Sequence, residues 1–200
     1  MTSHAALPKE IADQAETNSC GLVSTLRALH HLNAHLSEPE VKKLLESLAL
    51  HRDELSAFER FDPESYCRNR IFSNGFVDLL LLCWKPGQKT PIHDHSGSVC
   101  GVYVMRGEAS EIGFSPSGHG PLVPTGTHTV AAGNITVSSH DDTHVVANYA
   151  KSGEELVTLH CYSPPLQSMR VFAEKETFFA DYTGVTERAT TSGCFHVEIE

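Results

Sequence analysis

Hydrophobic residues in the first fifty positions recur at the spacing of an α-helix. They are Leu22, Leu26 and Leu29 in one segment, and Val41, Leu44, Leu45 and Leu48 in a second. Residues three and four apart lie on one face of a helix, so each segment predicts an amphipathic helix. Ser37 and Glu40 match a capping box, and Pro39 is tolerated in a first turn, so we expect the second helix to begin there.

From about residue 66 the pattern changes to short β-branched and apolar runs, separated by Gly, Pro, Asn and Asp. The runs are VDLLLLCW, CGVYVM, GNITVSS, HVVANY and ELVTLHCY. Such runs predict strands, and the tail adds two short ones at Met169 to Ala173 and Phe195 to Ile199. No helix fits between residues 66 and 165, which excludes alternating strand and helix units. We therefore expect a mainly β protein, a small antiparallel, jelly-roll-like β-barrel preceded by N-terminal helices.

Length and composition fit one domain. The chain has 200 residues, of which 40% are hydrophobic and 20% charged, an ordinary balance for a globular domain with a full core. We expect a single domain over residues 1–200, with a helical region at 1–60 and the barrel at 61–200.

The net charge and the lack of a targeting pattern limit the classes of binding partner and the location that we expect. A formal net charge of −10 argues against nucleic acid or an anionic membrane surface as the main partner. The N-terminus lacks a signal peptide pattern, and the longest apolar run, Val77 to Trp84, is too short to span a bilayer. We expect a cytoplasmic monomer or small homo-oligomer. Its six cysteines show no CxxC spacing, so most are expected to be reduced and buried.

The candidate chemistry lies in two histidine-containing segments. His93 and His95 are two apart, and on a strand such residues point to one face, where two imidazoles suit adjacent corners of a metal's coordination sphere. A third ligand must come from another strand. In GNITVSSHDDTHVVAN, alternation places His144 on one face with Val146 and Asn148, while His140 is the competing candidate.

The two segments resemble the two motifs of the cupin superfamily, which implies a small β-barrel holding one metal. The matching positions are Gly87, His93, His95 and Gly107 in the first motif, and Gly133, His144 and Asn148 in the second. This register favours His144 over His140, although Ser139 and Asp141 replace the usual Pro and Gly. Cys100 stands where the acidic ligand is usual. Three neutral imidazoles would leave an iron(II) site at a charge of about +2, which favours an anionic thiolate together with O₂.

Four further features resemble the cysteine dioxygenase family between about residues 60 and 166. Cys100 follows HDHSGSV, where animal members carry a cysteine joined by a thioether to a tyrosine and many bacterial members have glycine. LVTLHCYSPPL resembles the family's Ser-x-His-x-Tyr-Ser-Pro-Pro, with Thr158 in the serine position. YCRN, residues 66–69, resembles Tyr-x-Arg-Asn. The order and spacing of these pieces also follow the family, as in a bacterial-type member that has the crosslink cysteine.

The resemblance implies an iron(II) enzyme that oxidises the thiol of L-cysteine with O₂ to cysteine sulfinate. It assigns Fe(2+) to His93, His95 and His144, the substrate carboxylate to Arg68 with support from Tyr66, and catalysis to Tyr162, His160 and Cys100. Tyr162 would be the crosslink partner of Cys100, and His160 its hydrogen-bonding neighbour.

Several alternatives stay open. Arg70 lies two residues from Arg68, so a dicarboxylate thiol such as mercaptosuccinate is conceivable. Family members acting on 3-mercaptopropionate tend to have glutamine at the arginine position, so Arg68 favours cysteine. A different class is a non-catalytic cupin that senses or stores a ligand, or a metal-dependent isomerase.

Each residue also has a plainer interpretation. Tyr162 and His160 would suit a core hydrogen bond, and Cys100 a small buried hydrophobic position. Arg68 would suit an ion pair with a local acid, Asp62 or Glu64.

Overall fold

The computed structural model describes residues 21–48, 52–116, 122–139 and 142–172, and the backbone of 179–182, 187–189 and 195–197. Its helices are α2 (Leu22–His30), α3 (Glu38–Ser47), α4 (Arg52–Leu55) and the 3-10 turn η1 (Ser56–Phe58). Both predicted helices are present. The Glu40 carboxylate accepts hydrogen bonds from the backbone N–H and the hydroxyl of Ser37, at 2.7 and 2.6 Å, so α3 begins where the capping pattern predicted.

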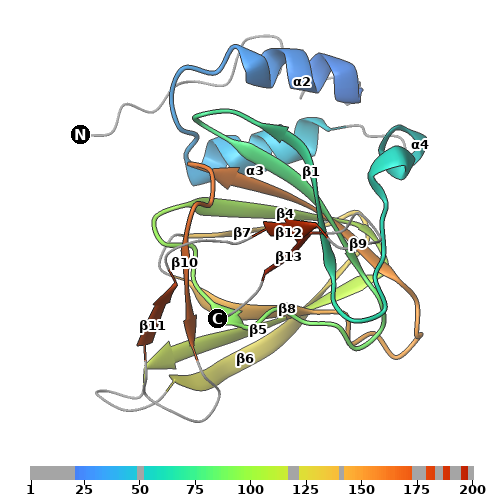
Figure 1. Ribbon diagram of the computed structural model, residues 1–200, viewed down its shortest axis with the longest axis vertical. Coiled ribbons are helices and arrows are strands. Elements are labelled where there is room, and N and C mark those ends of the chain that lie inside the picture. Colours follow the sequence, from blue (N-terminus) through green and yellow to red (C-terminus); the bar gives the residue numbers. More distant parts are fainter. Residues whose placement is uncertain are drawn as a thin grey trace.

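The strands form two main antiparallel sheets (Figure 1). They are β1 (Cys67–Ser73), β2 (Asp78–Trp84), β3 (Ile92–His93), β4 (Val99–Arg106), β5 (Glu108–Pro116), β6 (Leu122–Ala131), β7 (Ile135–Ser138), β8 (Thr143–Ala147), β9 (Leu156–Ser163), β10 (Met169–Phe172), β11 (Phe179–Tyr182), β12 (Glu187–Ala189) and β13 (Phe195–Val197). One sheet has the order β1-β2-β9-β4-β7 and the other β11-β10-β3-β8-β5-β6, while β12 and β13 form a two-stranded sheet. Helices α2 and α3 cover the outer face of the five-stranded sheet. The inner face of that sheet lies toward the six-stranded sheet, and the two sheets together form a barrel.

Strand β2 is buried on both faces, which explains its uninterrupted apolar sequence. Leu79 and Leu81 pack with the helices, whereas Leu80 and Leu82 face the barrel interior. The neighbouring strand β9 is likewise fully buried and alternates in the same way. Its inward positions carry polar side chains, and these form one wall of the site described below.

Strands β5 and β6 were not predicted. Most of β6 is exposed to solvent, so its sequence shows no alternation of buried and exposed positions.

The motif glycines Gly87, Gly107 and Gly133 all have positive φ, a conformation that glycine adopts without strain.

The fold is the predicted mainly β cupin barrel with two N-terminal helices. Through the described parts of residues 66–165 the structure has no helix, as expected. The two predicted tail strands are present as β10 and β13, although Ala173 and residues 198–199 lie outside the described parts. None of the described helices has the length and apolar character needed to cross a membrane. The division into a helical region at 1–60 and a barrel at 61–200 stays a prediction.

Candidate metal centre

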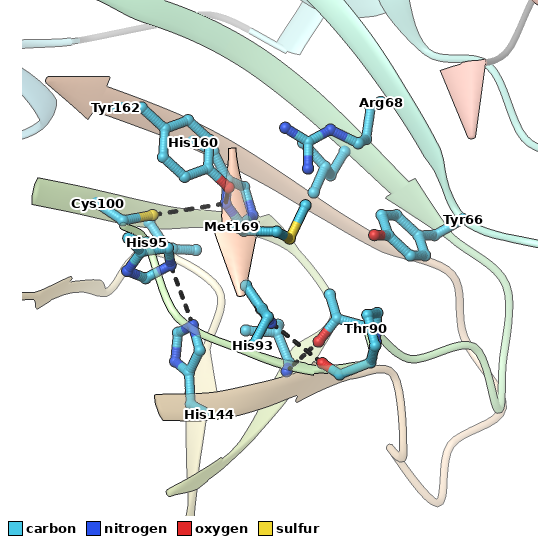
Figure 2. Close-up of a pocket in the computed structure, with 14 residues that line it drawn as sticks. Tyr66, Arg68, Thr90, His93, His95, Cys100, His144, His160, Tyr162 and Met169 are labelled. Atoms are coloured by element: carbon cyan, nitrogen blue, oxygen red, sulfur yellow. Dashed lines mark hydrogen bonds between the residues drawn. The ribbon is translucent and has the colours of Figure 1, made fainter. Parts of the chain in front are cut away.

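Three histidines converge inside the barrel. His93 ends β3 and pairs directly with His144 of β8, while His95 follows β3 by two residues. One ligand atom from each histidine lies within 4.8 Å of the others, and Nε2 of His144 is 3.2 Å from Nε2 of His95 (Figure 2). All three are buried. The predicted three-histidine metal site is therefore assembled; His140 lies outside the described residues.

In two of the three rings, Nδ1 faces away from the other histidines and is hydrogen-bonded. These bonds turn the remaining nitrogen, Nε2, toward the centre of the cluster. Nδ1 of His93 donates to the carbonyl of Pro91 at 3.1 Å, and Nδ1 of His144 donates to the carboxylate of Glu111 at 2.7 Å. Burial lowers the pKa of His93 to about 3 and the pKa of His95 well below its usual value. Because Nδ1 donates in His93 and in His144, Nε2 of each of these two rings carries a lone pair that can bind a cation placed among the three histidines.

The spacing of the nitrogens fits a metal ion. Imidazole nitrogens bind such ions at about 2.1 Å, so two of them on neighbouring corners lie roughly 3 Å apart. The 3.2 Å between His95 and His144 is close to this value. An all-nitrogen, uncharged donor set suits a borderline metal such as iron or zinc better than calcium or magnesium.

Glu111, on β5, was not anticipated. The residue is 8% exposed, and its carboxylate accepts hydrogen bonds from His144 through Oε1 and from His128 through Oε2, the latter at 3.1 Å. Although burial raises its pKa, the hydrogen bonds and charges of His144 and His128 bring the pKa of Glu111 below its usual value. A carboxylate therefore stands directly behind a metal ligand, where it fixes the orientation of that ring.

The histidines line a narrow cavity together with the other predicted site residues. Its walls are Tyr66, Arg68, Leu82, Thr90, Pro91, His93, His95, Cys100, Val102, His144, Val146, His160, Tyr162 and Met169. Arg68 is 5% exposed, and its guanidinium lies 5.8 Å from the centroid of the Tyr162 ring. Tyr66 is hydrogen-bonded to Arg68 and stacks on Trp84 with ring centroids 4.3 Å apart. The cavity thus holds a cationic group opposite the histidines, as Figure 2 shows.

Arg70 does not share this cavity, contrary to the expectation from its spacing. Its guanidinium lies 4.0 Å from the Asp78 carboxylate, and it lines a separate depression with Asn74 and Pro165. Arg70 lies in the middle of β1, next to the irregularity in the β1–β2 register between Arg70 and Phe72, and it is the first exposed residue of that strand. Simple alternation from Arg68 therefore does not carry its side chain into the cavity. This arrangement removes the reason for expecting a second carboxylate on the substrate.

Cys100 and Tyr162 are direct cross-strand partners on β4 and β9. The Tyr162 hydroxyl is hydrogen-bonded to the Cys100 thiol and lies 3.2 Å from Nδ1 of His160. Burial raises the pKa of Cys100 to about 12 and the pKa of Tyr162 well above its usual value. Both groups are therefore protonated at neutral pH, and their side chains are close, as a crosslink between them requires.

Asp94 joins the histidine segment to β10, a contact that the sequence did not reveal. Its side chain is fully buried, forms an ion pair with Arg170 and accepts the backbone N–H of Arg170 at 3.1 Å. The neighbouring Met169 lines the cavity. Because β10 also pairs with β3, this aspartate holds one wall of the cavity against the metal ligands.

Most of the described cysteines are reduced and buried, as predicted, while Cys20 and Cys194 lie outside the described residues. Cys83, Cys100 and Cys161 are free and buried, as expected of reduced thiols. Cys67, beside Arg68 on β1, is instead disulfide-bonded.

Comparison with known proteins gives matches over most of the chain. A family model described as Cysteine dioxygenase type I matches residues 11–175. Cysteine dioxygenase type 1 of Danio rerio is 30% identical over 177 residues, which cover 80% of this chain and 86% of that protein. The Bos taurus protein of the same name is 28% identical over 186 residues, covering 86% and 92%.

Solved structures give a likeness in fold. An uncharacterized conserved protein of Klebsiella pneumoniae with a double-stranded β-helix domain matches with a TM-score of 0.51 and 15% identity. The match covers 60% of this chain and 95% of the other. It supports the barrel architecture and nothing finer.

Proposed function

Because the chain belongs to the cysteine dioxygenase type I family, we propose that it is an iron(II)-dependent thiol dioxygenase whose substrate is L-cysteine and whose product is cysteine sulfinate. The observation that carries the proposal is one cavity that contains both a three-histidine metal site and a buried arginine. In the balanced reaction a thiol and O₂ give a sulfinate and a proton. The O–O bond breaks, both oxygen atoms form bonds to sulfur, and sulfur gives up four electrons.

The metal site supports this chemistry through its charge. His93, His95 and His144 would hold iron(II) as neutral ligands, so the ion keeps a charge of about +2, which lowers the pKa of a nearby thiol. When bound, iron(II) supplies the redox chemistry that lets O₂ react with the thiolate sulfur. The protein supplies position, charge and a cavity from which water is largely excluded.

Arg68 is proposed to bind the substrate carboxylate. A guanidinium forms two parallel hydrogen bonds with a carboxylate, and burial strengthens them. The stacked pair of Tyr66 and Trp84 holds the arginine from one side. Since Arg70 lies outside the cavity, a substrate with one carboxylate fits better than mercaptosuccinate. L-Cysteine and 3-mercaptopropionate share that feature, and Arg68 in place of glutamine favours cysteine.

Tyr162, which lies beside Arg68, is proposed to act on the reacting atoms, with His160 orienting its hydroxyl and Cys100 as its crosslink partner. Tyr162 would keep its proton on Oη and donate a hydrogen bond to the oxidised sulfur group as it forms. A thioether between Cys100 Sγ and a Tyr162 ring carbon would form as one S–H and one C–H bond break, with both hydrogens and two electrons passing to O₂ to give hydrogen peroxide, and it would hold the ring still.

Replacing Cys100 by alanine tests the role of the crosslink. We expect Cys100→Ala to lower turnover, because the Tyr162 ring gains freedom, while iron binding is retained because all three histidines remain. Turnover is measured by O₂ uptake and iron content by metal analysis. A mass for the wild-type chain two hydrogens below that of the uncrosslinked chain would mark the thioether, provided thiol labelling excludes a further disulfide.

The proposed function is tested by O₂ consumption of the iron(II)-reconstituted protein with L-cysteine, 3-mercaptopropionate and mercaptosuccinate, with products identified by mass spectrometry. We expect sulfinate from L-cysteine, lost in His144→Ala and kept in His31→Ala, an exposed position at the end of α2. O₂ uptake with one of the other two thiols but not with L-cysteine would assign that thiol as the substrate. No uptake with any thiol would overturn the enzyme and favour a ligand-sensing cupin.

A further inference from the structure

The metal cavity is smaller than the molecule proposed to bind in it. Its walls leave a space of about 10 Å³, which is room for about one water molecule. A thiol-carboxylate that reaches from the three histidines to Arg68 is several times larger. At least one side chain of the wall must therefore give up its place when such a molecule binds.

The aromatic and hydroxyl side chains near Arg68 are held where they are. Tyr66 is stacked on Trp84 with ring centroids 4.3 Å apart and is hydrogen-bonded to Arg68. Thr90 Oγ1 accepts a hydrogen bond from the backbone N–H of Val146 at 3.0 Å. Moving any of these side chains would break a buried hydrogen bond or a ring contact, which costs free energy.

The polar side chains around the metal site are held in the same way. His93 and His144 use Nδ1 in the hydrogen bonds described above, and a bound metal ion would hold Nε2 of both rings. His160 lies 2.9 Å from Thr158 Oγ1 and 3.2 Å from Tyr162 Oη. These residues therefore form a rigid part of the wall.

Met169 differs from the rest of the wall. Leu82, Val102 and Val146 carry branched side chains on strands that are paired on both sides. Met169 is unbranched and has three rotatable bonds, so it changes shape at little cost. It is 2% exposed, and Figure 2 shows its side chain directed into the space between Arg68 and the histidines.

The strand that carries Met169 cannot make room in its place. The backbone N–H of Arg170 donates to the Asp94 carboxylate, and the backbone N–H of Asp94 donates to the Arg170 carbonyl, both at 3.1 Å. The two side chains form an ion pair, and Val171 pairs with His93 on β3. Because β10 is anchored to the metal-binding segment, the change that opens the cavity is a rotation of the Met169 side chain.

We propose that Met169 is a specificity-determining residue: its side chain fills the middle of the cavity, rotates away when a thiol binds, and limits how bulky that thiol can be. A molecule with its sulfur at the histidines and its carboxylate at Arg68 places its carbon chain in this middle part. Met169 therefore restricts branching of that chain. The identity of the bound thiol rests on the proposed function, whereas the limit on size does not.

The limit is measured on the cobalt(II)-loaded protein without O₂, where a thiolate bound to the metal gives a charge-transfer absorption band. L-Penicillamine, which is cysteine with two methyl groups on Cβ, tests the tolerance for branching. We expect the wild type to bind L-cysteine in strong preference to L-penicillamine. Met169→Ala removes the side chain beyond Cβ, so the ratio of the two affinities should move toward penicillamine by about tenfold or more.

Two variants and a matched control keep this test decisive. Met169→Val shortens the side chain and suits a strand, so it should shift the ratio in the same direction even if Met169→Ala fails to fold. Met105→Ala changes a methionine that packs on the helix side of β4 and should keep the wild-type ratio. Wild-type ratios in both Met169 variants, at equal cobalt content, would overturn the proposal.

Azide and imidazole separate this inference from the proposed function. Both bind cobalt(II) without a thiol, and imidazole is the bulkier of the two. Met169→Ala should strengthen imidazole binding relative to azide binding, and an unchanged ratio would overturn the inference. If the iron(II) protein oxidises no thiol, the proposed function fails, yet the imidazole and azide affinities still decide whether Met169 limits the space at the metal site.

Discussion

At the scale of single residues, Glu111 shows how this site obtains a negative charge without a carboxylate ligand. Cys100 occupies the position where the cupin pattern has its acidic ligand, yet a carboxylate lies one hydrogen bond further out, behind His144 at 2.7 Å. A carboxylate in that position makes the imidazole a stronger donor and holds the ring in the orientation that exposes Nε2. A metal ion bound by the three histidines would therefore keep its charge, while its ligand His144 is held firmly.

We predict that Glu111→Gln weakens iron(II) binding by about 10- to 100-fold, because the amide neither carries charge nor orients His144 as strongly. Affinity is measured by competition with a chelator. Glu108→Gln, at an exposed position of the same strand, is the matched control and should bind as the wild type does. Equal affinity for both variants would show that the hydrogen bond to His144 is not needed.

The ligands could be predicted from the sequence and their supporting residues could not, for a physical reason. His93 and His95 are two residues apart, so the alternation of a strand relates them directly. Glu111 meets His144 across 33 residues, and Trp84 meets Thr158 across 74. Such contacts depend on which strands pair and in which register, and no local pattern encodes that.

At the scale of elements, the same limit separates strands that were predicted from strands that were not. Strands β2 and β9 are buried on both faces and therefore read as long apolar runs. Strand β6 lies at a sheet edge and is largely exposed, so threonine, glycine and histidine replace the apolar residues. Its position follows from pairing with β5 and not from its own sequence.

The contact between α3 and β4 gives a prediction at this scale. A Cβ atom on Gly101 would lie 2.5 Å from Val41 Cγ1 and 2.6 Å from Leu45 Cδ1, so Gly101→Ala must displace these two side chains or the helix that carries them. We expect a loss of about 1–3 kcal/mol in the free energy of unfolding, measured by urea denaturation. Gly126→Ala, whose Cβ would meet nothing within 4 Å, is the control. Equal stability of the two variants would show that α3 packs loosely.

At the scale of the whole molecule, the barrel interior keeps several histidines neutral, and this couples folding to pH. His93 has a pKa of about 3 in the folded protein, and the pKa of His160 is also well below its usual value. The unfolded chain binds protons on these groups below about pH 6.5 and the folded chain does not. The stability they contribute is thus complete above that pH and is lost as the pH falls.

For the metal-free protein we therefore predict a free energy of unfolding that decreases between pH 7 and pH 5, by up to about 1.4 kcal/mol per pH unit for each such histidine. Urea denaturation at several pH values measures it. His160→Gln should have a shallower slope, whereas the exposed control His31→Ala should keep the wild-type slope. A slope unaffected by His160→Gln would mean that this ring is protonated inside the fold.

The burial of Arg68 also affects how a molecule reaches the cavity. Its guanidinium is 5% exposed, so an approaching thiol meets the field of a polyanion with a formal charge of −10. A thiol that carries only a carboxylate is repelled during diffusion, while zwitterionic cysteine, with no net charge, is not. Added salt screens this repulsion over about 10 Å. Encounter rates of anionic thiols should therefore rise with ionic strength and those of cysteine should not, so that the long-range field sorts compounds of similar shape before any of them is bound.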